Sequence, residues 1–484
     1  MACQIELGCH GTHPPRMFSV LSLVCLLALG ATALNCQASL RRHVCARLEP
    51  ARAFTVTIAA AGHGEADTQS STEKAPQTRT STDLNVLLQE AEDALGKKDY
   101  EAALAPLKAV TGAAPDSADA WFYLGYAYHR LHQEADARAA YERAVQLNPE
   151  LYQAQVNLGL ILLGLKDVSA ALPHLQKAVA LKPAEARPHL DLGDALQASG
   201  QVSEAQNELR RALELDPRLD RAAYELGKIE LEEKQYSSAA GDFEKALVLN
   251  PERAQAELGI ASADEALGQT SQAEQHLESY LKMQPADASV RFHLARLYLQ
   301  ENKSDLALPQ LQQLEQAHAE IPGLDAALAD AYARAGKLSD SESFYRKALA
   351  AAPSGPDAAD LHRALAATLV KEGKTAEAES EFRTALRLDP NGADALKGLA
   401  ETLYLEQRWS DAAPIIERLV QSPSAPAGFY FFLATCYDHL RDRKPALDAY
   451  VQFLQRSNGS NPDQEWQARQ RAKLLSRELG KPIK

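Results

Sequence analysis

Two adjacent stretches of sequence decide the fold. Residues 120–130 read AWFYLGYAYHR, and residues 134–147 read EADARAAYERAVQL. In the first stretch Trp121, Leu124 and Tyr128 are three and four residues apart, so they lie on one face of an α-helix. The first stretch therefore predicts an amphipathic helix.

The second stretch predicts another helix, which packs on the first. Ala137, Tyr141 and Ala144 share one helical face, and Pro149 follows shortly after them. Proline ends a helix because it has no N–H to donate and its ring clashes with the preceding turn. Gly125, inside the first stretch, lets the second helix approach closely. The two stretches together predict a helix–turn–helix unit.

The same unit recurs along most of the chain. A small residue marks eleven units, and nine of the ten intervals between these residues are 34 long: Ala91, Gly125, Gly159, Gly193, Gly227, Ala261, Ala295, Ala329, Ala366, Ala400 and Ala434. An alanine or serine follows each of them by twelve residues, and a proline closes eight of the eleven units. Because three classes of residue keep one period, the chain is expected to be a repeat array.

The unit resembles the tetratricopeptide repeat, whose signature is W-x2-L-G-x2-Y followed by A, F or Y, A and P. The best match consists of Trp121, Leu124, Gly125, Tyr128, Ala137, Tyr141, Ala144 and Pro149. The resemblance covers residues 84–460 and implies an all-α fold, a right-handed α-solenoid of about eleven repeats. The first repeat and the last two depart most from the signature, as terminal repeats commonly do.

Residues 461–484 predict a helix that caps the last repeat. Asn461 offers an N-cap, Pro462 suits the first helical position, and Gln464 supplies an amide at the third. An apolar stripe is formed by Ala468, Ala472, Leu475 and Leu479, and the other face carries Arg469, Arg471, Lys473 and Arg477. A basic amphipathic helix is also typical of contact with a membrane or a calmodulin-like partner, which is the alternative.

Residues 1–33 predict a secretory signal peptide. Arg16 precedes residues 17–40, which contain no charged residue, and an A-x-A cleavage site ends at Ala33. Cleavage after Ala33 is favoured over cleavage after Ala38, and Met17 is an alternative start. The competing interpretation is an uncleaved membrane anchor, because residues 17–40 are long enough to span a bilayer.

Residues 34–83 predict a disordered linker. Their second half is rich in Ala, Gly, Ser and Thr and has no hydrophobic period. Cys36 suggests a lipoprotein, but the three residues before it match a lipobox poorly. The signal pattern indicates a bacterial protein that is exported to the periplasm or the cell envelope, with membrane contact only through residues 17–40 if they are retained.

Composition excludes several classes of protein. The net charge of the 484 residues is −14, which disfavours nucleic-acid binding because such proteins carry a basic patch. Residues 1–52 carry +3, so the rest of the chain carries −17. Five of the six cysteines lie in the first 45 residues, so neither a disulfide framework nor a four-cysteine zinc site can hold the repeats together.

Binding is expected where the first helices of the repeats line a concave groove. The family resemblance implies that the variable positions 2, 5, 9, 12 and 13 of each repeat face this groove. Aromatic and basic residues at these positions are the candidates, because such side chains dominate interface energetics. The candidates for binding a protein or peptide are Phe122, Tyr126, Arg130, Arg187, Arg221, Tyr224, Lys228, Phe292, Arg296, Arg363, Lys397, Tyr404 and Phe431. The alternative for each aromatic residue is that it only packs between neighbouring repeats.

No motif for catalysis, cofactor binding or metal binding is found. The sequence contains no P-loop, no G-x-G-x-x-G, no H-E-x-x-H, no G-x-S-x-G and no C-x-x-C. His129 and His132 are three residues apart on a helix, but His129 is expected to face the groove and His132 the turn, so no metal site is predicted. We expect no catalytic residues and no cofactor.

The expected function is therefore that of an exported scaffold for protein–protein or protein–peptide interaction. One alternative is a membrane-tethered assembly chaperone or a subunit of a secretion or envelope complex. Another is a regulatory subunit of a separate enzyme. Self-association is left open.

Overall fold

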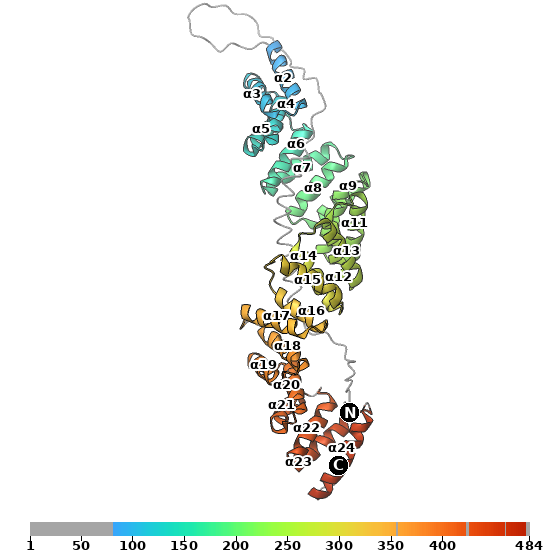
Figure 1. Ribbon diagram of the computed structural model, residues 1–484. Coiled ribbons are helices and arrows are strands. Elements are labelled where there is room, and N and C mark those ends of the chain that lie inside the picture. Colours follow the sequence, from blue (N-terminus) through green and yellow to red (C-terminus); the bar gives the residue numbers. More distant parts are fainter. Residues whose placement is uncertain (1–80, 355–356, 423–424, 460, 481–484) are drawn as a thin grey trace, which may run out of the picture. The chain divides into compact units, whose positions relative to one another are not determined.

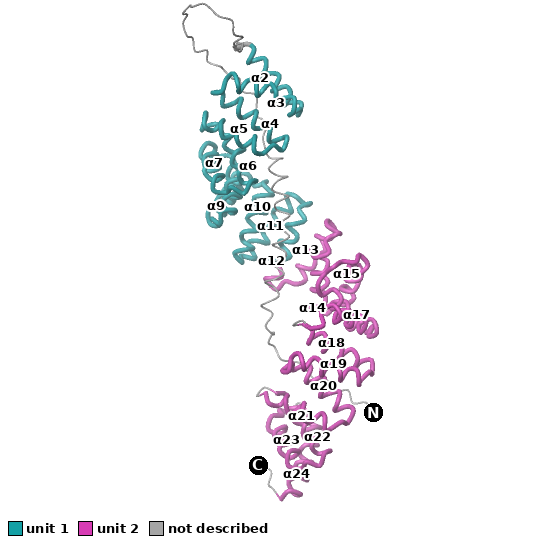
Figure 2. The backbone as a smooth tube through the Cα atoms, turned by 90° about the vertical axis from the view of Figure 1, so that its left-hand side faces the viewer, with its two compact units in different colours: residues 1–263 teal, residues 264–484 magenta. Residues whose placement is uncertain are grey.

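The computed structural model describes residues 81–354, 357–422, 425–459 and 461–480, and all secondary structure in these residues is α-helical. The predicted signal peptide and residues 34–80 of the predicted linker lie outside this range. Figure 2 shows two compact units, residues 1–263 and 264–484, and each unit is described by itself.

Helices follow one another in chain order through the first unit (Figure 1). They are α2 (Ser81–Gly96), α3 (Tyr100–Ala113), α4 (Ala118–Arg130), α5 (Glu134–Leu147), α6 (Tyr152–Gly164), α7 (Val168–Leu181), α8 (Ala186–Ala198), α9 (Val202–Leu215), α10 (Asp220–Glu232), α11 (Tyr236–Leu249) and α12 (Ala254–Ala266). The boundary between the units falls inside α12. Helix α2 begins at Ser81, so it includes the last three residues that were predicted as linker.

The second unit continues the series. Its helices are α13 (Thr270–Met283), α14 (Ala288–Gln300), α15 (Ser304–Gln316), α16 (Leu324–Arg334), α17 (Leu338–Ala351), α18 (Ala358–Lys371), α19 (Thr375–Leu388), α20 (Ala393–Leu405), α21 (Trp409–Val420), α22 (Ala427–His439), α23 (Arg443–Arg456) and α24 (Pro462–Leu479). In the described part of the chain, α2 to α23 thus supply eleven first helices (even numbers) and eleven second helices (odd numbers). The predicted all-α repeat architecture, with a final extra helix, is confirmed.

Within each unit, first helices pack on the second helix of their own repeat, as α4 does on α5 and α18 on α19. First helices of neighbouring repeats also contact each other directly, as in α6 with α8 and α8 with α10 of the first unit, and α16 with α18 and α18 with α20 of the second. The first helices of these neighbouring repeats therefore present a shared face within their own unit. We call the residues at positions 2, 5, 9, 12 and 13 of the repeats the first-helix face.

Glycines at the recurring small position bring the two helices of a repeat together. A Cβ atom on Gly125 would lie 2.8 Å from Cδ1 of Tyr141, and one on Gly159 would lie 2.6 Å from Cγ of Leu175. Both facing side chains are fully buried. The bulky side chain of the facing helix therefore already fills the space beside each of these glycines and leaves no room for a Cβ atom.

The closing prolines also contribute a hydrogen bond to the next repeat. The indole Nε1 of Trp121 donates to the carbonyl oxygen of Pro115 at 3.0 Å, and the amide Nε2 of Gln155 donates to that of Pro149 at 2.8 Å. At the same repeat position, His189 forms a hydrogen bond with the carbonyl oxygen of Pro183, and Arg291 donates one to that of Pro285. Different donors thus satisfy one recurring carbonyl group, so the signature tryptophan is replaceable there by another N–H donor.

The final helix α24 packs against α23, and Ala468, Ala472 and Leu475 are buried in this contact. The prediction of a cap is confirmed, and Asn461 and Pro462 occupy the predicted N-cap and first helical positions. The Asn461 side chain, however, makes no capping hydrogen bond. The carboxylate of Glu465 instead reaches back and accepts hydrogen bonds from the Ser457 hydroxyl and the Gly459 N–H. This contact ties the start of α24 to the loop before it.

We expect Gly159→Ala to destabilise the first unit by about 1–3 kcal/mol, because the added methyl group overlaps the buried branch point of Leu175. Gly241→Ala is the matched control. It lies within α11 with no atom near an added Cβ, and the higher helix propensity of alanine should add up to about 1 kcal/mol of stability. Urea unfolding of both variants checks this, and an equal effect at the two positions would contradict the packing role of Gly159.

Candidate functional site

Burial divides the six predicted aromatic binding residues into two groups. Phe122, Tyr126 and Phe431 are buried, with at most 8% of their surface exposed. Tyr224, Phe292 and Tyr404 are half-buried and keep part of the ring accessible. The three residues of the second group therefore expose more ring surface to a ligand. All six residues remain predictions as binding residues.

The buried aromatic side chains pack between neighbouring helices. Phe122 contacts the ring of Tyr141, with 5.8 Å between ring centroids, and Tyr126 meets Tyr100 edge to face at 6.1 Å. Arg130 lies over the same Tyr100 ring, with its guanidinium carbon 5.0 Å from the centroid. The contacts with Tyr100 of α3 join the first repeat to the second, whereas Phe122 and Tyr141 pack within the second repeat. This part of the first-helix face is therefore used for packing.

Three candidates are brought together on α10. Arg221, Tyr224 and Lys228 lie within two turns of this helix, beside Glu225. Arg221 donates to Asp194 of α8 at 2.6 Å, and the Lys228 ammonium lies 2.6 Å from Glu225. We call this group, with Asp220 and Arg253, the α10 cluster.

Arg253, in the turn before α12, completes the α10 cluster. Its guanidinium carbon lies 5.0 Å from the Tyr224 ring centroid, and the Lys228 ammonium lies 5.7 Å from the same centroid. Its Nε also donates to Asp220 at 3.1 Å. The variable positions of the first helices did not indicate Arg253, because it belongs to a turn.

Charges in the α10 cluster compensate one another. Three acidic residues, Asp194, Asp220 and Glu225, face three basic residues, so the net charge of the cluster is zero. Burial alone would raise the pKa of Glu225, but Lys228 and Arg221 outweigh it and hold the pKa below its ordinary value. The pKa of Asp220 is likewise lowered against burial by its hydrogen bonds to Arg253 and Asn250. The carboxylates of Glu225 and Asp220 are thus ionised at neutral pH and keep the cations in place.

A second group of aromatic side chains lies on α20, α21 and α22. The Tyr404 ring lies 5.1 Å from that of Trp409 and 4.8 Å from that of Phe432. Trp409 in turn stacks on the ring of His439 at 4.3 Å with nearly parallel planes. The buried Phe431 meets Phe432 edge to face at 6.4 Å and also packs against Phe453 at 5.3 Å. Only Tyr404 and Phe431 were predicted, since Trp409 begins a second helix and Phe432 occupies position 6.

The remaining candidates do not converge on one site. Arg187 is exposed on α8, and Arg363 pairs with Asp360 on its own helix at 3.2 Å. Phe292 and Arg296 are half-buried on α14, and Lys397 is half-buried on α20. The first-helix face of each unit therefore presents several separate polar and aromatic groups.

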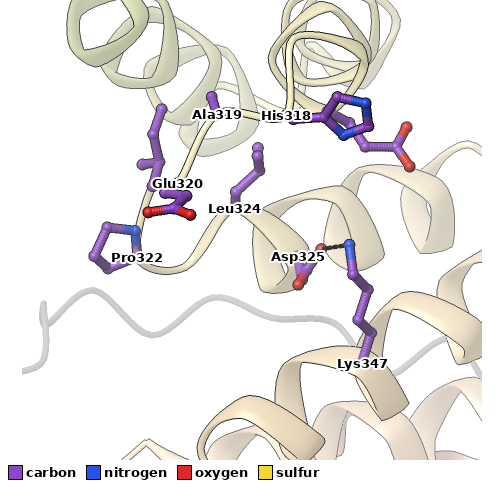
Figure 3. Close-up of a pocket in the computed structure, with 9 residues that line it drawn as sticks. His318, Ala319, Glu320, Pro322, Leu324, Asp325 and Lys347 are labelled. Atoms are coloured by element: carbon purple, nitrogen blue, oxygen red, sulfur yellow. Dashed lines mark hydrogen bonds and ion pairs between the residues drawn. The ribbon is translucent and has the colours of Figure 1, made fainter.

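A hollow of about 640 Å³ lies elsewhere, between the α15–α16 connection and α17 (Figure 3). Glu320, Pro322 and Leu324 line it from the connection, and Lys347 of α17 donates to Asp325 at 2.7 Å across it. No predicted site residue lines this hollow. It results from the irregular connection in which Ala319 stands at the position of the closing proline.

His129 is buried, so the expectation that it faces the groove is wrong. It is 1% exposed, and neither ring nitrogen has a hydrogen-bond partner. Burial, together with the nearby positive charges of Arg130 and His132, lowers the pKa of His129 to about 4. Among the described residues no group of three His, Cys, Asp or Glu side chains could hold a metal ion, and no helix is long and apolar enough to cross a membrane.

Two family models, both described as tetratricopeptide repeat, match the chain. One matches residues 88–150, 132–186, 294–356 and 363–428, and the other matches residues 162–228 and 230–291. Together they cover more than half of the sequence, so the chain belongs to the tetratricopeptide repeat family. Repeats of this family are typically non-catalytic scaffolds for interaction with proteins or peptides.

Curated and solved relatives cover only part of the chain. Tetratricopeptide repeat protein 37 of Xenopus laevis is 33% identical over 95 residues, which make up 19% of this chain and 6% of that protein, so the chain spans only a small part of it. MamA of Desulfovibrio magneticus RS-1 is 25% identical over 35% of this chain and 96% of its own, with a TM-score of 0.34. PilW, a type IV pilus biogenesis factor, is 22% identical over 45% of this chain and all of its own, with a TM-score of 0.39.

We expect the stability of the wild-type chain to fall in mild acid because His129 resists protonation. Its pKa is about 4 in the fold and 6.5 ordinarily, so the unfolded chain binds the proton first and stability is lost as pH falls from about 6.5 toward 4. Between pH 7.5 and pH 5 this loss is about 2 kcal/mol. Urea unfolding of His129→Leu should show a pH dependence smaller by that amount, and an unchanged dependence would contradict the assignment.

Proposed function

We propose that this chain is an exported scaffold that binds proteins or peptides through its first-helix face and catalyses no reaction of its own. The observation that carries the proposal is the α10 cluster. It places the half-buried ring of Tyr224 beside three cations and three carboxylates, on helices from successive repeats.

The α10 cluster suits a ligand that runs across several repeats. Tyrosine and arginine are the residues on which interface energetics most often depend. Because Asp194 and Glu225 already hold Arg221 and Lys228 in position, a ligand would not have to order these long side chains. The cluster has no net charge, so it favours a peptide with both acidic and basic side chains over a strongly charged one.

Export is proposed on the sequence of residues 1–40 alone. A basic residue, an uncharged apolar stretch and a small-x-small site follow one another there, which is typical of a secretory signal. The periplasm or cell envelope is the compartment that such a signal implies.

The binding proposal is tested with Tyr224→Ala, Phe292→Ala and Tyr404→Ala combined in the full chain. These rings are half-buried, so their removal should leave the fold intact while weakening a partner recovered from envelope extract. A loss of about 30-fold or more in affinity is expected, because one truncated hot-spot residue commonly costs about 2 kcal/mol or more. Affinity for the recovered partner is measured by titration calorimetry.

Tyr128→Ala with Phe344→Ala is the matched control. Tyr128 lines a hollow against α5, and Phe344 of α17 stacks on Tyr332, so these half-buried rings lie between the first and second helices of their own repeats. The control should keep the affinity of the wild-type chain. An unchanged affinity in the triple variant, with its thermal unfolding preserved, would exclude the first-helix face as the binding surface.

Export is tested by membrane fractionation and N-terminal sequencing of the expressed full chain. We expect a soluble periplasmic form that begins at Leu34, because the favoured cleavage site ends at Ala33. A membrane-bound form that retains residues 17–40 would instead establish the anchor. A cytoplasmic form with an intact N-terminus would refute export.

A further inference from the structure

The end helix α24 has a second, outward face that its packing on α23 does not use. Ala468, Ala472 and Leu475 supply the buried face, and two of the three are alanines. On the opposite side the indole ring of Trp466 is 64% exposed and Leu474 is 45% exposed. The cap therefore leaves two large apolar side chains in water.

Cations surround these two side chains. Trp466, Gln470, Lys473 and Arg477 follow one another at intervals of four, three and four residues, so they form one stripe along α24. Arg469 and Leu474 flank this stripe. We call these six residues the outer face of α24.

The acidic residues nearest to the outer face are largely engaged. Glu465 pairs with Arg469 at 3.1 Å, and Glu478 pairs with Arg443 of α23 at 3.0 Å. Asp463 lies in the first turn, at the end of the helix away from the cations. Lys473 and Arg477 form no ion pair within the part of the chain that the structure describes, so they leave the outer face with uncompensated positive charge.

We propose that the outer face of α24 binds the surface of an anionic lipid bilayer. Tryptophan is favoured at the headgroup level of a membrane, and lysine and arginine beside it are attracted to anionic headgroups. Because the apolar face of α24 is already buried on α23, the helix cannot insert deeply. It binds peripherally and reversibly, with Trp466 and Leu474 reaching the headgroups.

Charge complementarity favours a lipid surface over an acidic protein. A folded acidic partner needs carboxylates fixed at matching positions, whereas lipid headgroups move laterally to meet the flexible Lys473 and Arg477. Residues 53–484 carry −17 in total, so the rest of the chain is repelled by an anionic bilayer. This repulsion leaves the outer face of α24 as the surface that meets the membrane and so orients the bound chain.

The test measures quenching of tryptophan fluorescence by brominated phosphatidylcholine in the full chain. Vesicles of this lipid with an equal amount of phosphatidylglycerol are compared with vesicles that lack phosphatidylglycerol. The signal lost in Trp466→Phe reports contact at α24 itself, whereas sedimentation would also register residues 17–40. We expect Trp466 to be quenched with the anionic vesicles only, and high salt to abolish the quenching by screening the charges.

Lys473→Gln with Arg477→Gln isolates the contribution of the cations. The lipid concentration that gives half-maximal quenching should rise about 25-fold, at about fivefold per cation. Lys97→Gln with Lys98→Gln, in the exposed turn between α2 and α3, makes the same change of charge and should have no effect. Quenching by neutral vesicles, no quenching at all, or quenching that survives the loss of both cations would each overturn the proposal. An acidic protein as the true ligand would appear as no quenching.

Discussion

The close approach of two helices at one small residue is the constraint on which every repeat depends. At Gly125 the facing ring of Tyr141 already occupies the space of a Cβ atom, so this pair of side chains sets the distance and the register of α4 and α5. Once this register is fixed, so is the place in space of the residue six positions after each closing proline. Trp121 then meets the Pro115 carbonyl, and His189 meets that of Pro183. A contact within each repeat thereby determines the bond to the previous repeat.

At Phe243 the same constraint extends to the next repeat. The ring of Phe243 on α11 lies between Gly227 of its own repeat and Gly259 of the next, and a Cβ at either glycine would come within about 3 Å of it. Tyr141 meets the next repeat in another way. Its hydroxyl accepts a hydrogen bond from Asn157 of that repeat at 3.2 Å. Phe243 is thus accommodated by a missing Cβ one repeat later, and Tyr141 is accommodated by a polar partner there.

Stacking and binding compete for the first-helix face. Several first helices contact the first helix of the adjacent repeat directly, so part of this face holds the repeats together. Tyr126 is buried against Tyr100 of the previous repeat. Tyr224 also packs on Phe243, yet it keeps part of its ring accessible beside Lys228 and Arg253. An aromatic ring on this face can thus pack between helices and still keep surface for a ligand.

The period of the small residues sufficed to predict the eleven helix pairs, because each repeat is fixed by contacts within about 34 residues. The end helix was predicted separately, from the apolar stripe of residues 461–484. The period did not suffice for the binding candidates. The burial of His129 and Tyr126 depends on side chains of adjacent helices, which positions along one helix do not encode. Arg253 was missed because a turn residue has no place in a helical pattern.

The end helix α24 shows most clearly what the sequence pattern leaves out. Its apolar stripe predicted the buried side of the helix, but the pattern did not indicate what the opposite side of the helix would present to solvent. The buried residues of α24 are two alanines and a leucine, all on the side that packs on α23. Because this contact uses one narrow side of the helix, Trp466 and the neighbouring cations stay exposed together on the opposite side.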